Sequence, residues 1–302
     1  MKIIIASILS VLFLTSCATQ VANLAYEDLS VESEYIISNQ LDEISGLQYE
    51  DNLFYGFNDS EGEPEIYTFN LDDPESLKTI RLKDAKNVDW EDMAMSDSLI
   101  FIGDFGNNIG NRKDQTIYTV RRADIDLSKE NQTIDTRPIS FFYPEQKNFD
   151  KQPYQHDFDM ESMVYFNDEI HLFTKEWKSE KTHHFTLDLV KGIQPAWLVE
   201  DFDLGFLATG ADVIQLNNYQ SRLAIVGYNR DGEVFLMLTD FKNKDKKWLD
   251  NPHTIIKIGE ADQLGQVEGV AFKTAKALCI SAEAINSDLG SIKQNVRCMR
   301  IN

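Results

Sequence analysis

The stretch DWEDMAMSDSLIFIGDFGNN, residues 89–108, shows the pattern that decides the fold. Acidic residues open a short apolar strand, and a second apolar strand follows and ends on a polar cluster. Related patterns occur in four further stretches: EISGLQYEDNLFYGFND from Glu43, DMESMVYFNDEIHLFTKEW from Asp159, TGADVIQLNNYQSRLAIVGYN from Thr209 and QVEGVAFKTAKALCISAE from Gln266. Intervals of roughly 45 to 70 residues are close to the spacing of propeller blades.

Each interval has room for four short strands, such as SGLQY, LFYGF, EIYTFN and LKTIRL in the first. The last repeat supplies only three, and the earlier run VESEYIIS, residues 31–38, supplies the missing outer strand. We therefore predict an all-β, five-bladed β-propeller whose ring is closed by an N-terminal strand, with six blades as the alternative. The polar stretch 145–156 explains the longest interval as an inserted loop.

The first residues indicate export. Lys2 precedes an apolar run from Ile3 to Leu14, and LTSC follows at residues 14–17. This run is typical of a secretory signal and is too short to span a bilayer of roughly 30 Å. LTSC resembles the lipobox of bacterial lipoproteins, which implies that Cys17 is lipidated after cleavage. The alternative is an ordinary secreted protein with an incidental cysteine.

These observations divide the chain into a signal peptide over 1–16, a lipidated Cys17 with a short tether over 17–30, and a single propeller domain over 31–302. The predicted membrane contact is the lipid on Cys17. Ala18 is not the aspartate that resembles an inner-membrane retention signal. The predicted location is therefore the cell envelope, at the outer membrane, with the body facing the periplasm or the cell surface.

The chain is strongly acidic, with 50 Asp and Glu against 29 Lys and Arg and a net charge of −21. This balance argues against binding nucleic acid or an anionic membrane through a basic face. It favours cations, cationic ligands or simple solubility, and we expect a monomer. Cys279 and Cys298 fall on neighbouring predicted strands, where an exported protein forms a disulfide or keeps two buried thiols.

Polar residues open each inner strand and close its antiparallel neighbour, so the blades bring them to one rim of the ring. The predicted ligand contacts on this rim are Glu43, Trp90, Asn107, Asn108, Lys175, Trp177, Tyr228 and Glu283. The predicted metal ligands are Glu91, Asp92, Asp104, Glu161, Asp212 and Glu268. Oxygen-rich clusters without His or Cys suit Ca²⁺. In the alternative interpretation, Glu91, Glu161 and Glu268 accept backbone amide hydrogen bonds and join the blades.

The loop GDFGNNIGNR, residues 103–112, is the densest single motif. Its glycines and asparagines permit left-handed turns, and Arg112 offers a charge for an anion. The alternative is a tight exposed turn. Other chemistries are not supported, because the chain has no HExxH motif and no G-x-S-x-G elbow.

The motifs ISGL, DWEDMA with FIGDFGNNIGNR, FDMESM with LFTKEW, TGAD with VGY, and VEGVAF cover nearly all of the mature chain. Together they resemble a family of exported bacterial lipoprotein β-propellers, mostly uncharacterised and distantly similar to phytase-like and SdiA-regulated propellers. The resemblance implies a propeller fold and a calcium-dependent, phosphatase-like or esterase-like ancestry. It also implies that Glu91, Asp92, Asp104, Glu161 and Glu268 face the ion. The chain departs from a phytase pattern because it lacks a cluster of Lys and Arg for phosphates.

Two functions from different classes follow. The first is a membrane-anchored propeller that binds a ligand or partner protein, with Ca²⁺, at an acidic channel mouth. The second is a metal-dependent hydrolase of phosphoesters, in which bound ions supply the positive charge. We prefer the first, because the sequence identifies no acid, base or nucleophile.

Overall fold

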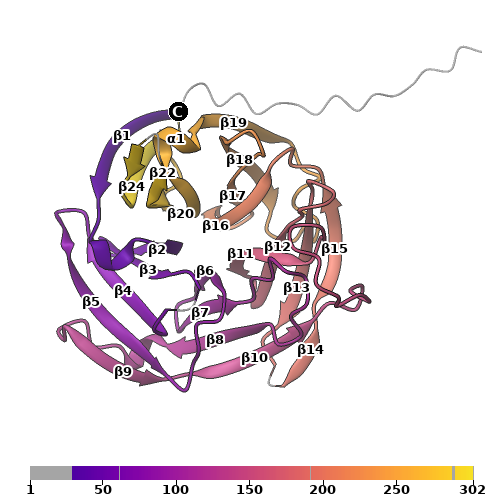
Figure 1. The fold of residues 1–302 in the computed structure, drawn as a ribbon, viewed down its shortest axis with the longest axis horizontal. Helices are drawn as coiled ribbons and strands as arrows, with labels where there is room; N and C mark the ends of the chain where they lie inside the picture. The colour runs from indigo at the N-terminus through magenta and orange to yellow at the C-terminus, as the bar shows by residue number, and fades with distance from the viewer. Residues whose placement is uncertain (1–28, 61, 191, 288–289, 302) are drawn as a thin grey trace, which may run out of the picture.

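The computed structural model describes residues 29–60, 62–190, 192–287 and 290–301. Strands in this part of the chain form five sheets arranged as blades around a central axis (Figure 1). The five-bladed prediction is confirmed, and the six-bladed alternative is wrong. Within these ranges, none of the helices has the length and hydrophobicity needed to span a bilayer.

The blades follow one another along the chain, and the strands of each blade are given in order from the inner strand to the outer strand. Blade 1 consists of β2 (Ile44–Glu50), β3 (Leu53–Asn58), β4 (Glu65–Asn70) and β5 (Asp73–Lys83). Blade 2 consists of β6 (Trp90–Met95), β7 (Leu99–Asp104), β8 (Thr116–Arg121) and β10 (Arg137–Phe142). Blade 3 consists of β11 (Asp159–Phe166), β12 (Glu169–Lys175), β13 (Thr182–Asp188) and β15 (Trp197–Phe202).

The last two blades complete the ring. Blade 4 consists of β16 (Leu207–Asn217), β17 (Gln220–Tyr228), β18 (Glu233–Lys242) and β19 (His253–Glu260). Blade 5 consists of β20 (Gln266–Thr274), β21 (Ala277–Glu283), β24 (Asn295–Ile301) and β1 (Leu29–Ile36). The remaining elements are short: η1 (Asn39–Leu41), η2 (Arg122–Asp124), α1 (Ala261–Leu264), β22 (Ile285–Ser287) and β23 (Gly290–Ile292).

The N-terminal strand closes the ring as predicted. β1 pairs antiparallel with β24, from Leu29 opposite Ile301 to Ile36 opposite Asn295. Strands from the two ends of the described chain therefore share one sheet (Figure 1). In the same blade a disulfide joins Cys279 on β21 to Cys298 on β24, which decides between the two states left open for these cysteines.

Blades 1 and 2 each pair with an extra strand that comes from the next blade along the chain. These two strands were not predicted from the sequence. β9 (Asn131–Asp135) pairs parallel with β5 of blade 1. β14 (Ile193–Pro195) pairs parallel with β10 of blade 2. Their sequences, NQTID and IQP, are short and mostly polar, so they carry little strand signal.

Apolar side chains pack between neighbouring blades. Trp90 from blade 2 is fully buried and meets Phe57 of blade 1 edge to face, with ring centroids 5.2 Å apart.

The predicted insertion is confirmed as a loop after β10, and it lies on the loop that follows β7. Its backbone amides at Gln152 and Tyr154 donate to the carbonyls of Ile109 and Asn108 at 2.8 and 3.0 Å.

Every inner strand has a β-bulge near its start. Register shifts leave an extra residue at Gly46, Glu161, Thr209 and Glu268, and leave Glu91 with Asp92 in blade 2. A bulge re-aims the side chain of the extra residue, and bulges are common beside functional sites. The residues of blades 1 and 4 that correspond to the bulged glutamates of the other blades are therefore Gly46 and Thr209.

Asp92 joins three blades inside the ring. Its Oδ2 accepts hydrogen bonds from the amide of Met163 in blade 3 at 2.7 Å and from that of Ala211 in blade 4 at 3.1 Å. Asp212 acts similarly, because its Oδ2 accepts from the amide of Phe272 in blade 5 at 2.7 Å. Among the described residues, the backbone amides that join neighbouring blades therefore donate to Asp92 and Asp212. The alternative interpretation had assigned such contacts to Glu91, Glu161 and Glu268.

We expect Asp92→Ala to lower the free energy of unfolding by roughly 3 kcal/mol, because each buried amide left without an acceptor costs about 1–3 kcal/mol. Urea denaturation measures the change. The exposed Asp97 on the turn after β6 is the control, and Asp97→Ala should stay within about 0.5 kcal/mol of the parent. Equal effects of the two substitutions would contradict the joining role.

Candidate functional site

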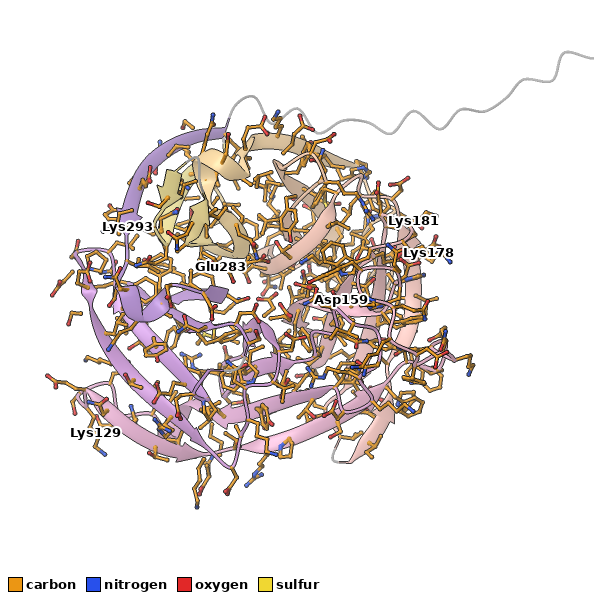
Figure 2. The ribbon with its side chains drawn as sticks, viewed as in Figure 1. Lys129, Asp159, Lys178, Lys181, Glu283 and Lys293 are labelled. Atoms are coloured by element: carbon orange, nitrogen blue, oxygen red, sulfur yellow. A yellow bond between two sulfur atoms is a disulfide. The ribbon has the colours of Figure 1, made fainter. Side chains whose placement is uncertain are left out.

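The predicted rim exists at one end of the ring. In all five blades the first residue of the inner strand pairs with the last residue of the second strand: Ile44 with Asn58, Trp90 with Asp104, Asp159 with Lys175, Leu207 with Tyr228, and Gln266 with Glu283. Figure 2 shows Asp159 and Glu283 near the centre of the ring, whereas Lys129, Lys178 and Lys181 lie at its periphery. Polar residues from all five blades therefore share one end of the channel.

A cavity of about 430 Å³ occupies this channel mouth. Residues of all five blades and of the inserted loop line it: Asp59, Glu91, Asn108, Tyr154, Glu161, Lys175, Trp177, Tyr228, Gln266 and Glu268. We call this cavity the mouth pocket. Carboxylates form one part of its wall, and Tyr154, Trp177 and Tyr228 provide an aromatic part.

Three glutamates at the bulges point into the mouth pocket. Glu91, Glu161 and Glu268 are buried, with 4%, 2% and 4% of their surface exposed. Glu91 Oε1 and Glu268 Oε2 are buried oxygens that make no hydrogen bond to any described residue. Since buried polar atoms nearly always have a partner, these oxygens are suited to contact a group from outside the chain.

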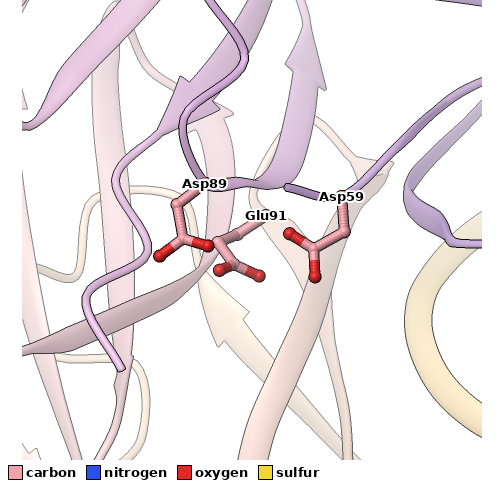
Figure 3. Close-up of side chains that lie close together, drawn as sticks. All are labelled: Asp59, Asp89 and Glu91. Carbon is pink, nitrogen blue, oxygen red and sulfur yellow. The ribbon is translucent and has the colours of Figure 1, made fainter. Parts of the chain in front are cut away.

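Asp59, Asp89 and Glu91 form a carboxylate cluster at the mouth, with one oxygen from each lying within 4.8 Å of the others. Figure 3 shows their carboxylates close together. Gly106 leaves room for this cluster, because a Cβ at that position would collide with Glu91 Oε1 and Asp89 Oδ2. This contact gives a physical reason for a glycine in the GDFGNN motif. The cluster could hold a metal ion.

Burial and mutual repulsion favour protons on these acids when no ion is bound. Burial, assisted by Asp89 and Glu268, raises the pKa of Asp59 to about 8. Burial, assisted by Asp159, raises the pKa of Asp89 to about 6. Burial and the neighbouring Glu161 hold the pKa of Glu91 well above its usual range. A cation would relieve the same repulsion.

Lys175 is the positive group of the mouth pocket. Its Nζ lies 3.3 Å from Glu161 Oε1 and stands 4.9 Å from the Trp177 ring centroid and 5.2 Å from that of Tyr228. Burial alone lowers the pKa of Lys175, but the carboxylates, led by Glu161, outweigh burial and hold this pKa well above its usual value. No salt bridge in the described chain reaches Asp59, Asp89 or Glu91.

Several predicted site residues lie outside the mouth pocket. Trp90 is in the core between blades 1 and 2, and its Nε1 donates to the carbonyl of Lys86 at 2.8 Å. Asn107 is buried, with its Nδ2 donating to the Phe158 carbonyl at 2.9 Å. Asp104 forms a salt bridge with Arg112 at 2.9 Å. Arg112 is thereby engaged within the chain rather than left for an anion.

The remaining predictions divide between the pocket and its edge. The structure brings seven of the predicted residues together in the lining of the mouth pocket: Glu91, Asn108, Glu161, Lys175, Trp177, Tyr228 and Glu268. Asp92 and Asp212 accept hydrogen bonds from backbone amides and do not line the pocket.

Two further predicted residues, Glu43 and Glu283, lie at the rim beside the mouth pocket. Burial, with Glu268 and Asp59 nearby, holds the pKa of Glu283 well above its usual range. Cys17 lies outside the described residues.

Two members of the carboxylate cluster, Asp59 and Asp89, were not predicted as ligands from the sequence. A signal for Asp89 was present, because residues two apart in an extended chain point to the same side. This alternation groups Asp89 with Glu91 and directs Trp90 to the opposite side, into the core. No local signal identifies Tyr154, which the inserted loop brings against Trp177 with ring centroids 4.8 Å apart.

No known protein-family model matches the chain. No curated protein matches it either. Among solved structures, the chain is similar to a protein of unknown function from Dyadobacter fermentans DSM 18053, with 10% identity over 91% of this chain and 99% of that chain and a TM-score of 0.44.

Two longer proteins also show a similarity of fold. A bifunctional GH43-CE protein from Bacteroides eggerthii has 10% identity over 86% of this chain and 36% of that chain, with a TM-score of 0.46. The NanB sialidase of Streptococcus pneumoniae, as its K499G mutant, has 11% identity over 81% of this chain and 35% of that chain, with a TM-score of 0.43. With all three TM-scores below 0.5, no argument about function rests on these similarities.

We expect the ion-free protein to lose stability as the pH rises from about 4 to about 8. The folded state keeps a proton on Asp89 up to about pH 6 and on Asp59 up to about pH 8, whereas the unfolded state has already released both, so rising pH favours unfolding. Thermal melting in chelator across this range measures the slope. Asp59→Asn should make the slope shallower, and an unchanged slope in that variant would contradict the assignment.

Proposed function

We propose that this protein is a lipid-anchored envelope propeller that holds a divalent cation, Ca²⁺, at Asp59, Asp89 and Glu91 and binds a ligand in the mouth pocket. The observation that supports this most is the buried oxygens of Asp59 and Glu91, Oδ1 and Oε1, which have no hydrogen-bond partner in the described chain. They lie within a cluster that forms no salt bridge with any Lys, Arg or His among the described residues.

The chemistry of the donors favours a hard cation. The cluster contains only carboxylate oxygens, with no His or Cys, and such sites suit Ca²⁺ rather than Zn²⁺ or Cu²⁺. Ca²⁺ takes about six to eight oxygens, so three carboxylates leave positions for water or for oxygens of a ligand. The cation is therefore expected to take part in ligand binding as well as to neutralise the acids.

The rest of the mouth pocket supplies contacts for the body of a ligand. Trp177, Tyr228 and Tyr154 offer aromatic faces, and Asn108 offers an amide. This combination suits an oxygen-rich ligand such as a carbohydrate, or a peptide from a partner protein. The anchored protein is expected to act as a monomer, because all five blades contribute to one pocket.

The cation is tested by calorimetric titration of Ca²⁺ into chelator-treated protein. We expect Glu91→Gln to weaken the affinity at least tenfold, because it removes a ligand charge, while the melting temperature of the ion-free variant changes little. Glu75→Gln, at an exposed position on β5, is the matched control. A large melting shift with unchanged Ca²⁺ affinity would instead assign Glu91 to structural support.

Gly106→Ala is a second variant for the same titration. The added methyl group would displace the carboxylates of Glu91 and Asp89 without removing any charge. We expect it to weaken Ca²⁺ binding, whereas Gly62→Ala, where the nearest atom lies at 3.6 Å, should not. Equal affinities for the two variants would place the ion elsewhere.

The anchor is tested separately by cell fractionation. We expect Cys17→Ser to move the protein from the membrane fraction to the soluble fraction, because the lipid on Cys17 is the proposed membrane contact. Ser16→Ala keeps the cysteine and is the control. Membrane association that persists in Cys17→Ser would contradict lipid anchoring.

A metal-dependent phosphoester hydrolase is the second candidate. One observation favours it: the Lys175 ammonium faces the same pocket as the carboxylate cluster, so a phosphoester would meet two positive centres. Hydrolysis of p-nitrophenyl phosphate that stops in chelator and returns with Ca²⁺ would support this function. Ca²⁺ binding without any such hydrolysis would support the binding function.

A further inference from the structure

A second cavity, of about 580 Å³, lies between blades 3 and 4 at the end of the strands away from the mouth. Blade 3 shows this placement: Asp159 and Lys175 lie at the mouth end of β11 and β12, while the cavity is lined by Phe166 and Glu169 at the other ends. We call this cavity the lower pocket. Its complete lining is Phe166, Asn167, Glu169, His171, Thr186, Trp197–Val199 and Lys244–Trp248.

The inner wall of the lower pocket is aromatic. The Trp248 ring is buried and stacks on the His171 ring, with centroids 4.0 Å apart and planes inclined by 28°. Phe166 meets Trp248 edge to face at 5.3 Å. On the outer side, Trp197 and Leu198 of β15 are 57% and 42% exposed. A flat apolar body would cover these exposed side chains and contact the aromatic wall.

His171 contributes no charge to this wall. His184 Nδ1 donates to Glu200 Oε1 at 2.9 Å, and its Nε2 accepts from His171 Nδ1 at 2.8 Å, which leaves a lone pair on Nε2 of His171. Burial and the neighbouring His184 lower the pKa of His171 to about 2. The inner wall therefore stays neutral at physiological pH, and the cationic groups that line the pocket are lysines.

Three lysines border the lower pocket in a chain that is acidic overall. Lys244, Lys246 and Lys247 come from the loop KNKDKKW, residues 242–248, between β18 and β19. Lys247 forms a salt bridge with Asp250 at 3.6 Å, whereas Lys244 and Lys246 are exposed and have no salt bridge to any described residue. Glu169 and Asp245 also lie in the lining. The basic loop is nonetheless unusual for a chain with a net charge of −21.

We propose that the lower pocket is a second binding site, which takes a small amphipathic anion: a flat apolar body that carries a carboxylate or phosphate. The body would lie between Trp197 and the Trp248 wall, and the anionic group would pair with Lys244 and Lys246. The volume falls within the range of about 300–1,000 Å³ typical of small-molecule sites. This site is independent of the cation and of the mouth pocket.

The test uses three probes with one ring system: 1-naphthoate, the neutral 1-naphthalenemethanol and the cationic 1-naphthylmethylammonium. Calorimetry with the whole chain in chelator should show 1-naphthoate binding at least tenfold more tightly than either of the others. Trp197→Ala should weaken both 1-naphthoate and 1-naphthalenemethanol, because it removes a contact for the ring. Chelator keeps the mouth free of cations, so failure here is distinguishable from failure of the Ca²⁺ proposal.

Charge variants identify the anion contact. Lys244→Ala with Lys246→Ala should weaken 1-naphthoate at least fivefold and leave 1-naphthalenemethanol unchanged. The control removes two exposed lysines elsewhere, Lys129→Ala with Lys178→Ala, and should leave both affinities unchanged. Equal affinities for the three probes, or equal losses in the two double variants, would overturn the proposal.

Discussion

Ring closure is the constraint on which the rest of this structure depends. The antiparallel pairing of β1 with β24 places the first described strand in the same blade as the last, so the inner strands of all five blades surround one axis. Residues separated by more than a hundred positions, such as Glu91 and Glu268, then line the same pocket. The disulfide between Cys279 and Cys298 lies in this closing blade and reinforces it.

The β-bulges at the starts of the inner strands distinguish acids that join the blades from acids that face the mouth pocket. The bulge in each inner strand directs Glu91, Glu161 and Glu268 into the mouth pocket, while Asp92 and Asp212 reach amides of neighbouring blades. Amide donors contact both aspartates, whereas Glu91 and Glu268 each keep a buried oxygen without a hydrogen-bond partner among the described residues. Such an arrangement costs stability unless protons or a cation neutralise the acids, so the mouth is better explained by binding than by support of the fold.

Sequence reasoning predicted the fold well, because strand pairs and their polar ends recur along the chain and register follows from alternation. It predicted the rim for the same reason. It did not indicate the contacts of Trp90, Asp92 and Asp212, since neighbouring residues in a strand point to different sides and a bulge cannot be located without the partner strand. The contacts of Asn107 and Asp104 were not indicated either, because their partners, Phe158 and Arg112, lie on loops whose folding no local pattern indicates. The parallel strands β9 and β14 and the lower pocket arise from contacts between blades, which the sequence alone does not place.

We propose above that the converging carboxylates at the mouth hold a cation. A crystal structure of protein purified without chelator and soaked in Tb³⁺, a stand-in for Ca²⁺, tests it most directly. We expect an anomalous peak about 2.3–2.6 Å from oxygens of Asp59, Asp89 and Glu91. A mouth without a peak, with the Glu91 carboxylate hydrogen-bonded to a backbone amide of the next blade, would contradict it.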